Sequence, residues 1–327
     1  MIAVVLAIIL MLFKLGAPAL SHFGWRFFFT DDWNPPMDIF GALPFIYGTL
    51  VTSLLALLIA GPISVGVALF LTEMAPNWLS RIIGFLVEML AAIPSVVYGL
   101  WGIFILAPAM QQHVQPFLTM CLGPDSMFAF ILGHVMMAIA YPFVLISNSV
   151  GFSALSLASL SDQMMSVAGH LFAGPNYGVG MLTAAIVLAI MVTPTICAIS
   201  REVFLTVPSS IKEASLALGA TRWEMIKMAV VKTTRSGILG AIILGLGRAL
   251  GETMAVTMVI GNRNEITAKL MAPGQTMASV IANEYPEATG VHMASLASIG
   301  LSLFAVSLII NSLARFIIWR VEGGGRR

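Results

Sequence analysis

An arginine and a glutamate inside an apolar stretch are the residues of this chain best suited to chemistry. The sequence GLGRALGETMAV, residues 245–256, places Arg248 and Glu252 within an apolar run over residues 237–261. Arg248 is next to the midpoint of that run and is therefore predicted near the centre of a bilayer, where a charged side chain costs about 2.5–3.5 kcal/mol. Arginine offers planar, permanently charged donors that suit a phosphate-type oxyanion. Glu252 would lower the local positive charge, so that the anion is passed on rather than trapped.

The spacing of these charges allows two interpretations. On one continuous helix, Arg248 and Glu252 are four residues apart and share nearly the same face. They form either a salt bridge that only locks helices together or a transient anion station on a polar path. Gly247 and Gly251 make a Gly-xxx-Gly pair that would let a second helix come close. Another charge in an apolar stretch, Glu88, has no basic neighbour in sequence, and we expect it at the interface or in helix packing.

The composition indicates that membrane helices must position these residues. Of the 327 residues, 59% are hydrophobic and 9% are charged, whereas about 25% are charged in an ordinary soluble domain. Seven apolar stretches approach or exceed the roughly 20 residues that a spanning helix needs, at about 2–20, 46–72, 82–110, 127–150, 177–200, 237–261 and 294–318. The first lacks the basic region and cleavage site of a signal peptide, so we expect it to remain as a span. The net charge of +1 gives no indication of a nucleic-acid partner.

The connecting segments differ in charge, which predicts the side of the membrane on which each lies. Segment 201–236 contains six basic residues and the end of the chain, 320–327, contains three. The positive-inside rule places both in the cytoplasm. Segments 111–126 and 151–176 contain no Lys or Arg, and segment 21–45 contains three aspartates, so we expect these outside. The N-terminus and the C-terminus are then both cytoplasmic.

The stretch 127–150 cannot cross the membrane once, because both of its flanking segments are of the external type. Either it is a re-entrant or interface-lying element, or it pairs with the weaker stretch 152–172 as a helical hairpin. The predicted fold is therefore an all-α, polytopic membrane bundle with about six core transmembrane helices and an extra element at about 127–172.

The long cytoplasmic segment has the pattern of two short helices. Ser210 and Glu213 form a capping-box pattern, and Gly219 is placed to end the first helix, expected over residues 211–218, in a left-handed conformation. Thr221 and Glu224 repeat the capping pattern for the second helix. The segment is either an amphipathic linker on the membrane surface or a docking element for a partner protein.

The sequence EASLALG within this segment resembles the cytoplasmic loop of permease subunits of ATP-driven importers. The family pattern is Glu-Ala-Ala, three residues, Gly, nine residues and then Ile-x-Leu-Pro. Glu213, Ala214 and Gly219 match it, Ser215 replaces the second Ala, and the closing pattern is degraded at residues 229–232. The resemblance implies that the first three belong to a helix that docks into a cleft of a separate ATPase and couples hydrolysis to transport.

The stretch GLGRALGETMAVTMVIGN is similar to the signature of phosphate-importer permeases of the PstC type. IYGTLVTSLLALLI, VALFLTEMAP, LAAIPSVVYGLWGIF and ANEYPEA also resemble that family, which covers most of residues 38–110 and 172–320. The resemblance implies a type I ABC importer permease in the inner membrane that moves inorganic phosphate by alternating access. It implies as partners a PstA-like second permease, a PstS-like phosphate-binding protein and a PstB-like ATPase dimer, which would bind ATP and Mg.

The resemblance also implies a division of the chain. Residues 1–37 form a first transmembrane helix and an external segment, and residues 38–320 form the permease transmembrane domain. That domain carries an inserted external or re-entrant region at about 111–175 and the coupling loop at 201–236, and residues 321–327 are a cytoplasmic tail.

Three other functions remain as alternatives: a permease for another oxyanion, a self-contained secondary anion transporter and an intramembrane enzyme. A secondary transporter should contain internal repeats or two matching broken helices, and the sequence has no convincing repeat. An enzyme should contain a nucleophile with a base or a metal cluster, and no such spacing is present. No lysine follows a glycine, so the chain has no phosphate-binding loop for ATP. We therefore expect no cofactor in the chain itself.

Overall fold

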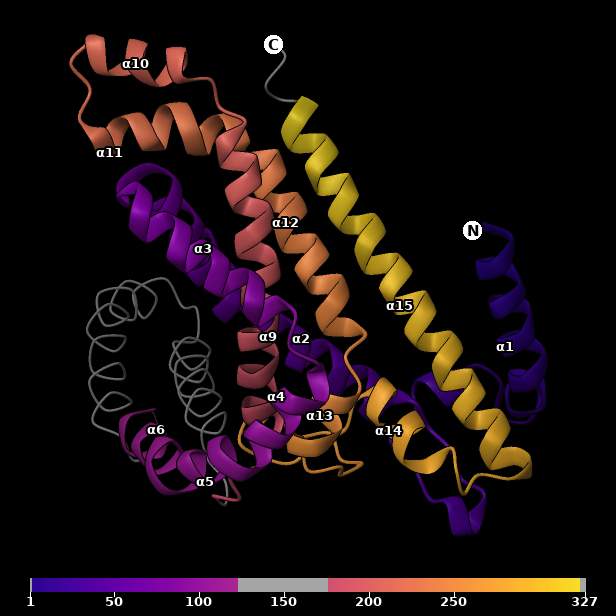
Figure 1. Cartoon of the computed structure of the whole chain (residues 1–327). Coiled ribbons are helices and arrows are strands. Elements are labelled where there is room, and N and C mark those ends of the chain that lie inside the picture. Colours follow the sequence, from indigo (N-terminus) through magenta and orange to yellow (C-terminus); the bar gives the residue numbers. More distant parts are fainter. Residues whose placement is uncertain (1, 123–175, 324–327) are drawn as a thin grey trace, which may run out of the picture.

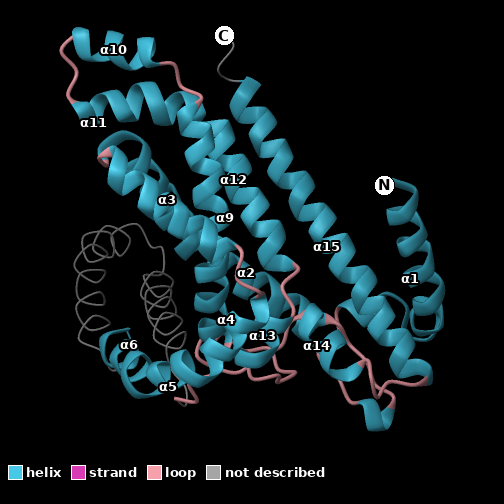
Figure 2. Ribbon diagram, in the orientation of Figure 1, coloured by secondary structure: helices cyan, strands magenta, loops and turns pink. Residues whose placement is uncertain are grey.

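The computed structural model describes residues 2–122 and 176–323 (Figure 1). Within these ranges the regular structure is helical, apart from one isolated β-bridge between Asn34 and Ile39 (Figure 2). The predicted all-α membrane fold is therefore confirmed. The stretch 127–150 and its predicted hairpin partner lie outside the described residues.

The described α-helices have the following bounds: α1 (Ile2–Phe23), α2 (Leu43–Leu69), α3 (Asn77–Ala91), α4 (Ser95–Trp101), α5 (Ala107–Ala109), α6 (Gln115–Leu122), α9 (Met181–Leu205), α10 (Ser209–Ala217), α11 (Arg222–Met225), α12 (Lys232–Leu250), α13 (Met254–Val259), α14 (Met277–Glu284) and α15 (Gly290–Gly323). Short 3-10 helices follow α1 (η1, Gly24–Phe28) and precede α2 (η2, Pro35–Met37). π-helical turns extend several elements: η3 (Phe70–Met74), η4 (Gly102–Leu106), η5 (Met110–Val114) and η6 (Ile226–Val231).

Five helices in the described ranges are long and apolar enough to cross a membrane, or up to six if a bent pair counts as one span. The five are Ala3–Phe28, Leu43–Met74, Met181–Leu205, Arg222–Leu250 and Gly290–Arg320. The bent pair joins Asn77–Ala91 to Ser95–Cys121 at 93°. The stretch 82–110 is therefore bent sharply, as a broken span or a re-entrant loop. Pro94 lies at the bend. The helix breaks there because proline removes a backbone donor and disfavours helical geometry in the residue before it.

Helix α9 forms the centre of the bundle. In its most apolar stretch 67% of the residues are buried, compared with 11% in the span nearest the N-terminus. The sequence of α9 is apolar on every side, which is the pattern of a helix enclosed by other helices. Its residues form one continuous apolar core with α2, α4, α12 and α13.

Four small residues of α12 allow close packing against α9. Gly237, Ala241, Gly245 and Ala249 recur every four residues, and the two alanines are almost completely buried. A Cβ added at Gly237 would lie 2.5 Å from the side chain of Val203, and one added at Gly245 would lie 2.6 Å from that of Ile196. Small residues at this spacing let helix backbones approach each other.

Among the described residues of this chain, no helix makes the close contact predicted at Gly247 and Gly251. Gly251 follows the last residue of α12, and an added Cβ there would approach only the backbone of α12 itself. An added Cβ at Gly247 would have Asn311 of α15 as its neighbour, at 3.9 Å. The packing motif of α12 is therefore the set of small residues on the adjacent face.

Helices α1 and α15 form an antiparallel pair beside the core (Figure 1). The Ser298 hydroxyl lies 3.2 Å from the Gly16 carbonyl oxygen, to which it donates a hydrogen bond. At the lower end in Figure 1, Trp33 of the segment after α1 donates to the Glu284 carboxylate over 2.9 Å, and His292 contacts the same oxygen. Helices α10 and α11 lie at the opposite end, where α15 ends.

Candidate functional site

Arg248 and Glu252 lie on different elements. Helix α12 ends at Leu250, the helix is broken at residues 251–253, and α13 begins at Met254. Arg248 is therefore in the last turn of α12, and Glu252 is in the break. The prediction that both share a face of one continuous helix is wrong, and the candidate span in this region runs over Arg222–Leu250 instead of 237–261.

Local preferences explain this break. Glycine in a helix interior costs about 1 kcal/mol relative to alanine, which weakens α12 at Gly251. The Glu252 carboxylate accepts a hydrogen bond from the Ala255 N–H at 3.4 Å and so satisfies a backbone donor in the first turn of α13.

Arg248 is hydrogen-bonded to α9 and also lines a groove between α12 and α15. Its Nη1 donates to Thr195 Oγ1 over 3.0 Å, directly after Pro194 in α9. The groove, with a volume of about 470 Å³, lies between α12 and α15. Its lining comprises Gly240, Ile243, Leu244, Gly247, Arg248, Asn311, Arg315 and Ile318. The arginine is half-buried, and none of the ion pairs among the described side chains includes it.

The coupling segment has the two predicted short helices, α10 and α11. Gly219 adopts φ +90° just after α10, as predicted for its terminator. The Thr221–Glu224 capping box is present, with the Thr221 N–H donating to the Glu224 carboxylate at 2.8 Å. The capping box predicted at Ser210 is wrong, because α10 begins at Ser209, two residues earlier than predicted, and its N-cap Pro208 makes no side-chain cap.

Helix α10 carries the residues predicted to dock onto an ATPase. Glu213 and Ala214 lie in it, and it contains no buried residue. Two large apolar side chains near it are also exposed, Leu218 at 90% and Trp223 at 63%. The surface around α10 is therefore open to a partner protein.

The sequence departure at residues 229–232 has a structural counterpart. Where the family pattern ends in proline, this chain has Lys232, the first residue of α12. Helix α11, the π-turn η6 and α12 follow one another without a loop, so Arg222–Leu250 is one helical run. A proline at this position would have removed a backbone donor and favoured a break.

One residue of the coupling region was missed by sequence reasoning. Glu73, in the π-turn η3 that continues α2, forms an ion pair with Lys212 of α10 at 2.5 Å. The Glu73 side chain is only 5% exposed and that of Lys212 is 21% exposed. The two residues are 139 positions apart, so no local pattern in the sequence could have paired them. This contact ties α10 to the π-turn that continues the core helix α2.

Glu88 has a partner that is distant in sequence. The Arg201 guanidinium of α9 lies 3.8 Å from the Glu88 carboxylate of α3. The Glu88 side chain is 63% exposed, so this pair adds little to stability. Its position between α3 and α9 agrees with the expected role in helix packing.

Known proteins provide independent information on this chain. Residues 60–323 match the family model described as the binding-protein-dependent transport system inner membrane component. The phosphate transport system permease protein PstC of Pasteurella multocida is 42% identical over 304 residues, which cover 93% of this chain and 82% of that protein. The protein with the same description from Mesorhizobium japonicum is 44% identical over 305 residues, covering 93% and 81%.

A solved structure of the MetNI methionine ABC transporter, in an inward-facing conformation, has a similar fold. Its TM-score is 0.54 at 15% sequence identity, and the alignment covers 88% of this chain and 99% of that one. Identity this low supports the fold alone, in agreement with the helical bundle described above. From the family match and these relatives, the chain belongs to the inner-membrane components of binding-protein-dependent transport systems.

Proposed function

We propose that this chain is the transmembrane permease subunit of an ATP-driven importer of inorganic phosphate. The observation that carries this proposal is the identity of 42–44% with two PstC permeases over 93% of the chain. The multi-span helical fold and the exposed coupling helix α10 support it. The importer moves phosphate across the cytoplasmic membrane by alternating access.

The chain acts as part of a complex. A phosphate-binding protein delivers the anion from outside, a second permease completes the pathway, and a separate ATPase dimer binds ATP and Mg. The end of the molecule with α10 and α11 lies in the cytoplasm, together with both termini, since basic residues are concentrated in segment 201–236. The chain itself hydrolyses no ATP.

Helix α10 couples the permease to the ATPase. Glu213 and Ala214 form part of the docking surface, and Gly219 fixes the direction in which the chain leaves α10. The ion pair between Lys212 and Glu73 transmits movement of α10 to α2, because it joins the two helices through a nearly buried carboxylate.

Arg248 is an anion station on the transport pathway. One of its N–H groups binds Thr195, and the guanidinium has further donors for a phosphate oxygen in the adjoining groove. Glu252, which lies four residues on in the helix break, limits the net charge so that the anion is released. Transport requires sites that release the anion as readily as they bind it.

Uptake of labelled oxyanions into membrane vesicles tests this function. Vesicles that contain the chain with its three kinds of partner should accumulate labelled phosphate only when ATP is supplied inside them. Unlabelled arsenate should compete because its shape and charge are similar, and sulfate and molybdate should not. Preferential uptake of sulfate or molybdate would assign the chain to another oxyanion, and uptake without the ATPase would make it a secondary transporter.

A further inference from the structure

A second arginine lines the groove that contains Arg248. Arg315 of α15 faces the groove together with Asn311, opposite Gly240 and Gly247 of α12. An adjoining hollow of about 520 Å³ is also lined by Asn311 and Arg315. The two hollows therefore meet at these two residues of α15.

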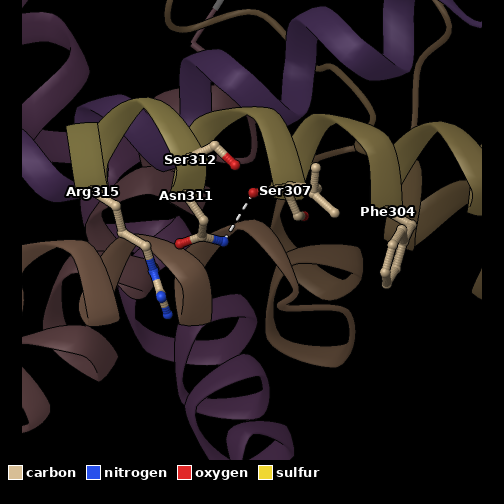
Figure 3. A pocket seen from close by; sticks show the side chains of 6 residues that line it. Phe304, Ser307, Asn311, Ser312 and Arg315 are labelled. Carbon is tan, nitrogen blue, oxygen red and sulfur yellow. Dashed lines mark hydrogen bonds between the residues drawn. The ribbon is translucent and has the colours of Figure 1, made fainter. Parts of the chain in front are cut away.

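Helix α15 presents a polar face to this region. Ser307, Asn311 and Arg315 follow one another at intervals of four residues, which places them on one side of the helix. Asn311 and Arg315 extend from the same side of α15, and Asn311 Nδ2 donates to the Ser307 carbonyl oxygen over 2.9 Å (Figure 3). Polar side chains in a spanning helix normally face a protein interior or a water-filled cavity.

The residues that line the groove include two arginines and no carboxylate. None of the ion pairs among the described side chains contains Arg248 or Arg315. Both guanidinium groups remain charged at any physiological pH. Two such charges in a hollow with apolar walls focus a positive potential that attracts anions.

Small residues keep the groove open on the side of α12. A Cβ added at Gly240 would meet no atom within 4 Å, and one added at Gly247 would meet only Asn311, at 3.9 Å. A methyl group added at either glycine would therefore fit without a clash.

We propose that Arg315 and Asn311 form a second oxyanion station, which takes the anion from Arg248 and passes it toward the end of the molecule with α10. Arg315 is one helical turn, about 6 Å, beyond Asn311 in that direction. Two weak stations in series allow an anion to be bound and then released. This inference rests on the proposed function, because it extends the pathway that begins at Arg248.

The ligand of this station is a tetrahedral oxyanion with a phosphate-type geometry. Such a group belongs both to free inorganic phosphate and to the headgroup of a phospholipid. The groove between α12 and α15 suits the transported ion, because one of its two arginines, Arg248, is half-buried and bonded to Thr195 of α9. An effect of lipid composition in place of free phosphate would contradict the inference.

Reaction of a single cysteine at Ser307, in the hollow that adjoins the groove, measures the potential beside Arg315. The complete reconstituted complex carries Ser307→Cys, with Cys121→Ser and Cys197→Ala to remove the native thiols. Anionic and cationic methanethiosulfonates of similar size are applied from the side of α10. We expect the anionic reagent to react faster than the cationic one. Arg315→Gln should lower the ratio of the anionic to the cationic labelling rate several-fold. Inorganic phosphate should slow labelling by the anionic reagent. Arg320→Gln, which removes a charge on α15 outside the groove, should leave the ratio unchanged.

Phosphate uptake supplies the second measurement. Arg315→Gln should lower uptake by about tenfold, the scale of one charge-assisted hydrogen bond, while Arg315→Lys retains part of it. The matched control, Arg320→Gln, should transport normally. If Arg315→Gln fails to assemble, labelling of Ser307→Cys with Arg315 intact still tests the second station. Slower labelling in the presence of inorganic phosphate would support the station, and an unchanged rate would contradict it.

The outcomes separate this inference from the proposed function. If Arg248→Gln abolishes uptake while Arg315→Gln changes neither uptake nor the labelling ratio, the second station is overturned and the first remains. If Arg248→Gln also transports normally, the anion pathway itself is wrong. If phosphate gives no protection and labelling instead changes with the phosphatidylglycerol content of the vesicles, the groove binds a lipid headgroup and the inference fails.

Discussion

At the scale of single residues, the contacts of Arg248 favour a role in the pathway over a structural salt bridge. Arg248 is hydrogen-bonded to Thr195 of α9, and Glu252 lies beyond the end of α12, the helix that contains Arg248. The sequence indicated both charges, since an ionised residue in an apolar run is conspicuous. The groove on the side of α15 was not predictable, because Arg315 is 67 residues away from Arg248 in the sequence.

The exchanged pair Arg248→Glu with Glu252→Arg distinguishes the two roles. We expect the exchanged protein to assemble without transporting phosphate, because the arginine would lie in the helix break and lose both Thr195 and the groove. Glu252→Gln alone should impair uptake by holding the anion too tightly. Phosphate uptake and the amount of assembled complex are measured together. Good transport by the exchanged pair would make the two residues a structural salt bridge.

Thr195→Val tests the contact that orients Arg248. Loss of the acceptor of a charged donor costs about 1–3 kcal/mol, so uptake should fall several-fold. Thr193→Val is the matched control, because the Thr193 hydroxyl bonds only within α9, to the Ala189 carbonyl at 2.7 Å. Equal uptake by the two variants would show that Thr195 does not position Arg248.

The ion pair between Glu73 and Lys212 should be essential for coupling. Removing one partner of a buried pair leaves an unpaired charge and costs about 3–5 kcal/mol, so Lys212→Met should reduce phosphate uptake per ATP hydrolysed. The exchanged pair Glu73→Lys with Lys212→Glu should recover part of it. The exposed pair Arg263–Glu265 is the control, and Arg263→Met should have little effect. Normal coupling in Lys212→Met would exclude this contact from the transmission of movement.

At the scale of elements, local rules predicted some boundaries correctly and missed others. Gly219 and the Thr221–Glu224 box depend on residues close in sequence, and both are present. The break at residues 251–253 was missed because apolar residues lie on both sides of it and read as one span. The stretch 82–110 reads in the sequence as one apolar run, yet its two arms meet at 93° beside Pro94.

Gly219→Pro should uncouple the ATPase from transport. Glycine accepts the observed φ of +90°, whereas proline is fixed near −65° and would change the direction of the chain between α10 and α11. We expect normal membrane insertion but a loss of substrate-stimulated ATP hydrolysis and uptake. Gly61→Ala, inside α2 where an added Cβ meets nothing within 4 Å, should behave normally. Unchanged coupling in Gly219→Pro would exclude α10 from the mechanism.

At the scale of the whole molecule, the distribution of basic residues predicts which end of the helical bundle faces the cytoplasm. The end with α10 lies opposite the end with α5, α6 and α14 (Figure 1). Charged side chains near the membrane surface fix which end is cytoplasmic, whereas contacts between helices are the same in either orientation. The orientation in the membrane is therefore predicted from the charged residues, whereas the arrangement of the spans is determined by contacts between helices.

Labelling of single cysteines tests this orientation. After Cys121 and Cys197 are replaced, His113→Cys and Asp162→Cys should both react with an impermeant thiol reagent added from outside. Ser210→Cys in α10 should react only when the membrane is opened. Labelling of only one of the first two would mean that the stretch 127–150 crosses once. External labelling at residue 210 would reverse the proposed orientation.

Simultaneous measurement of phosphate uptake and ATP hydrolysis in proteoliposomes tests the central claim most directly. The purified complex contains this chain, the second permease and the ATPase, and the binding protein is added outside. The account predicts uptake of labelled phosphate that requires ATP and every component. It also predicts that Arg248→Gln nearly abolishes uptake in a complex that still assembles. Phosphate uptake that persists without the ATPase, or that is unaffected by Arg248→Gln, would contradict it.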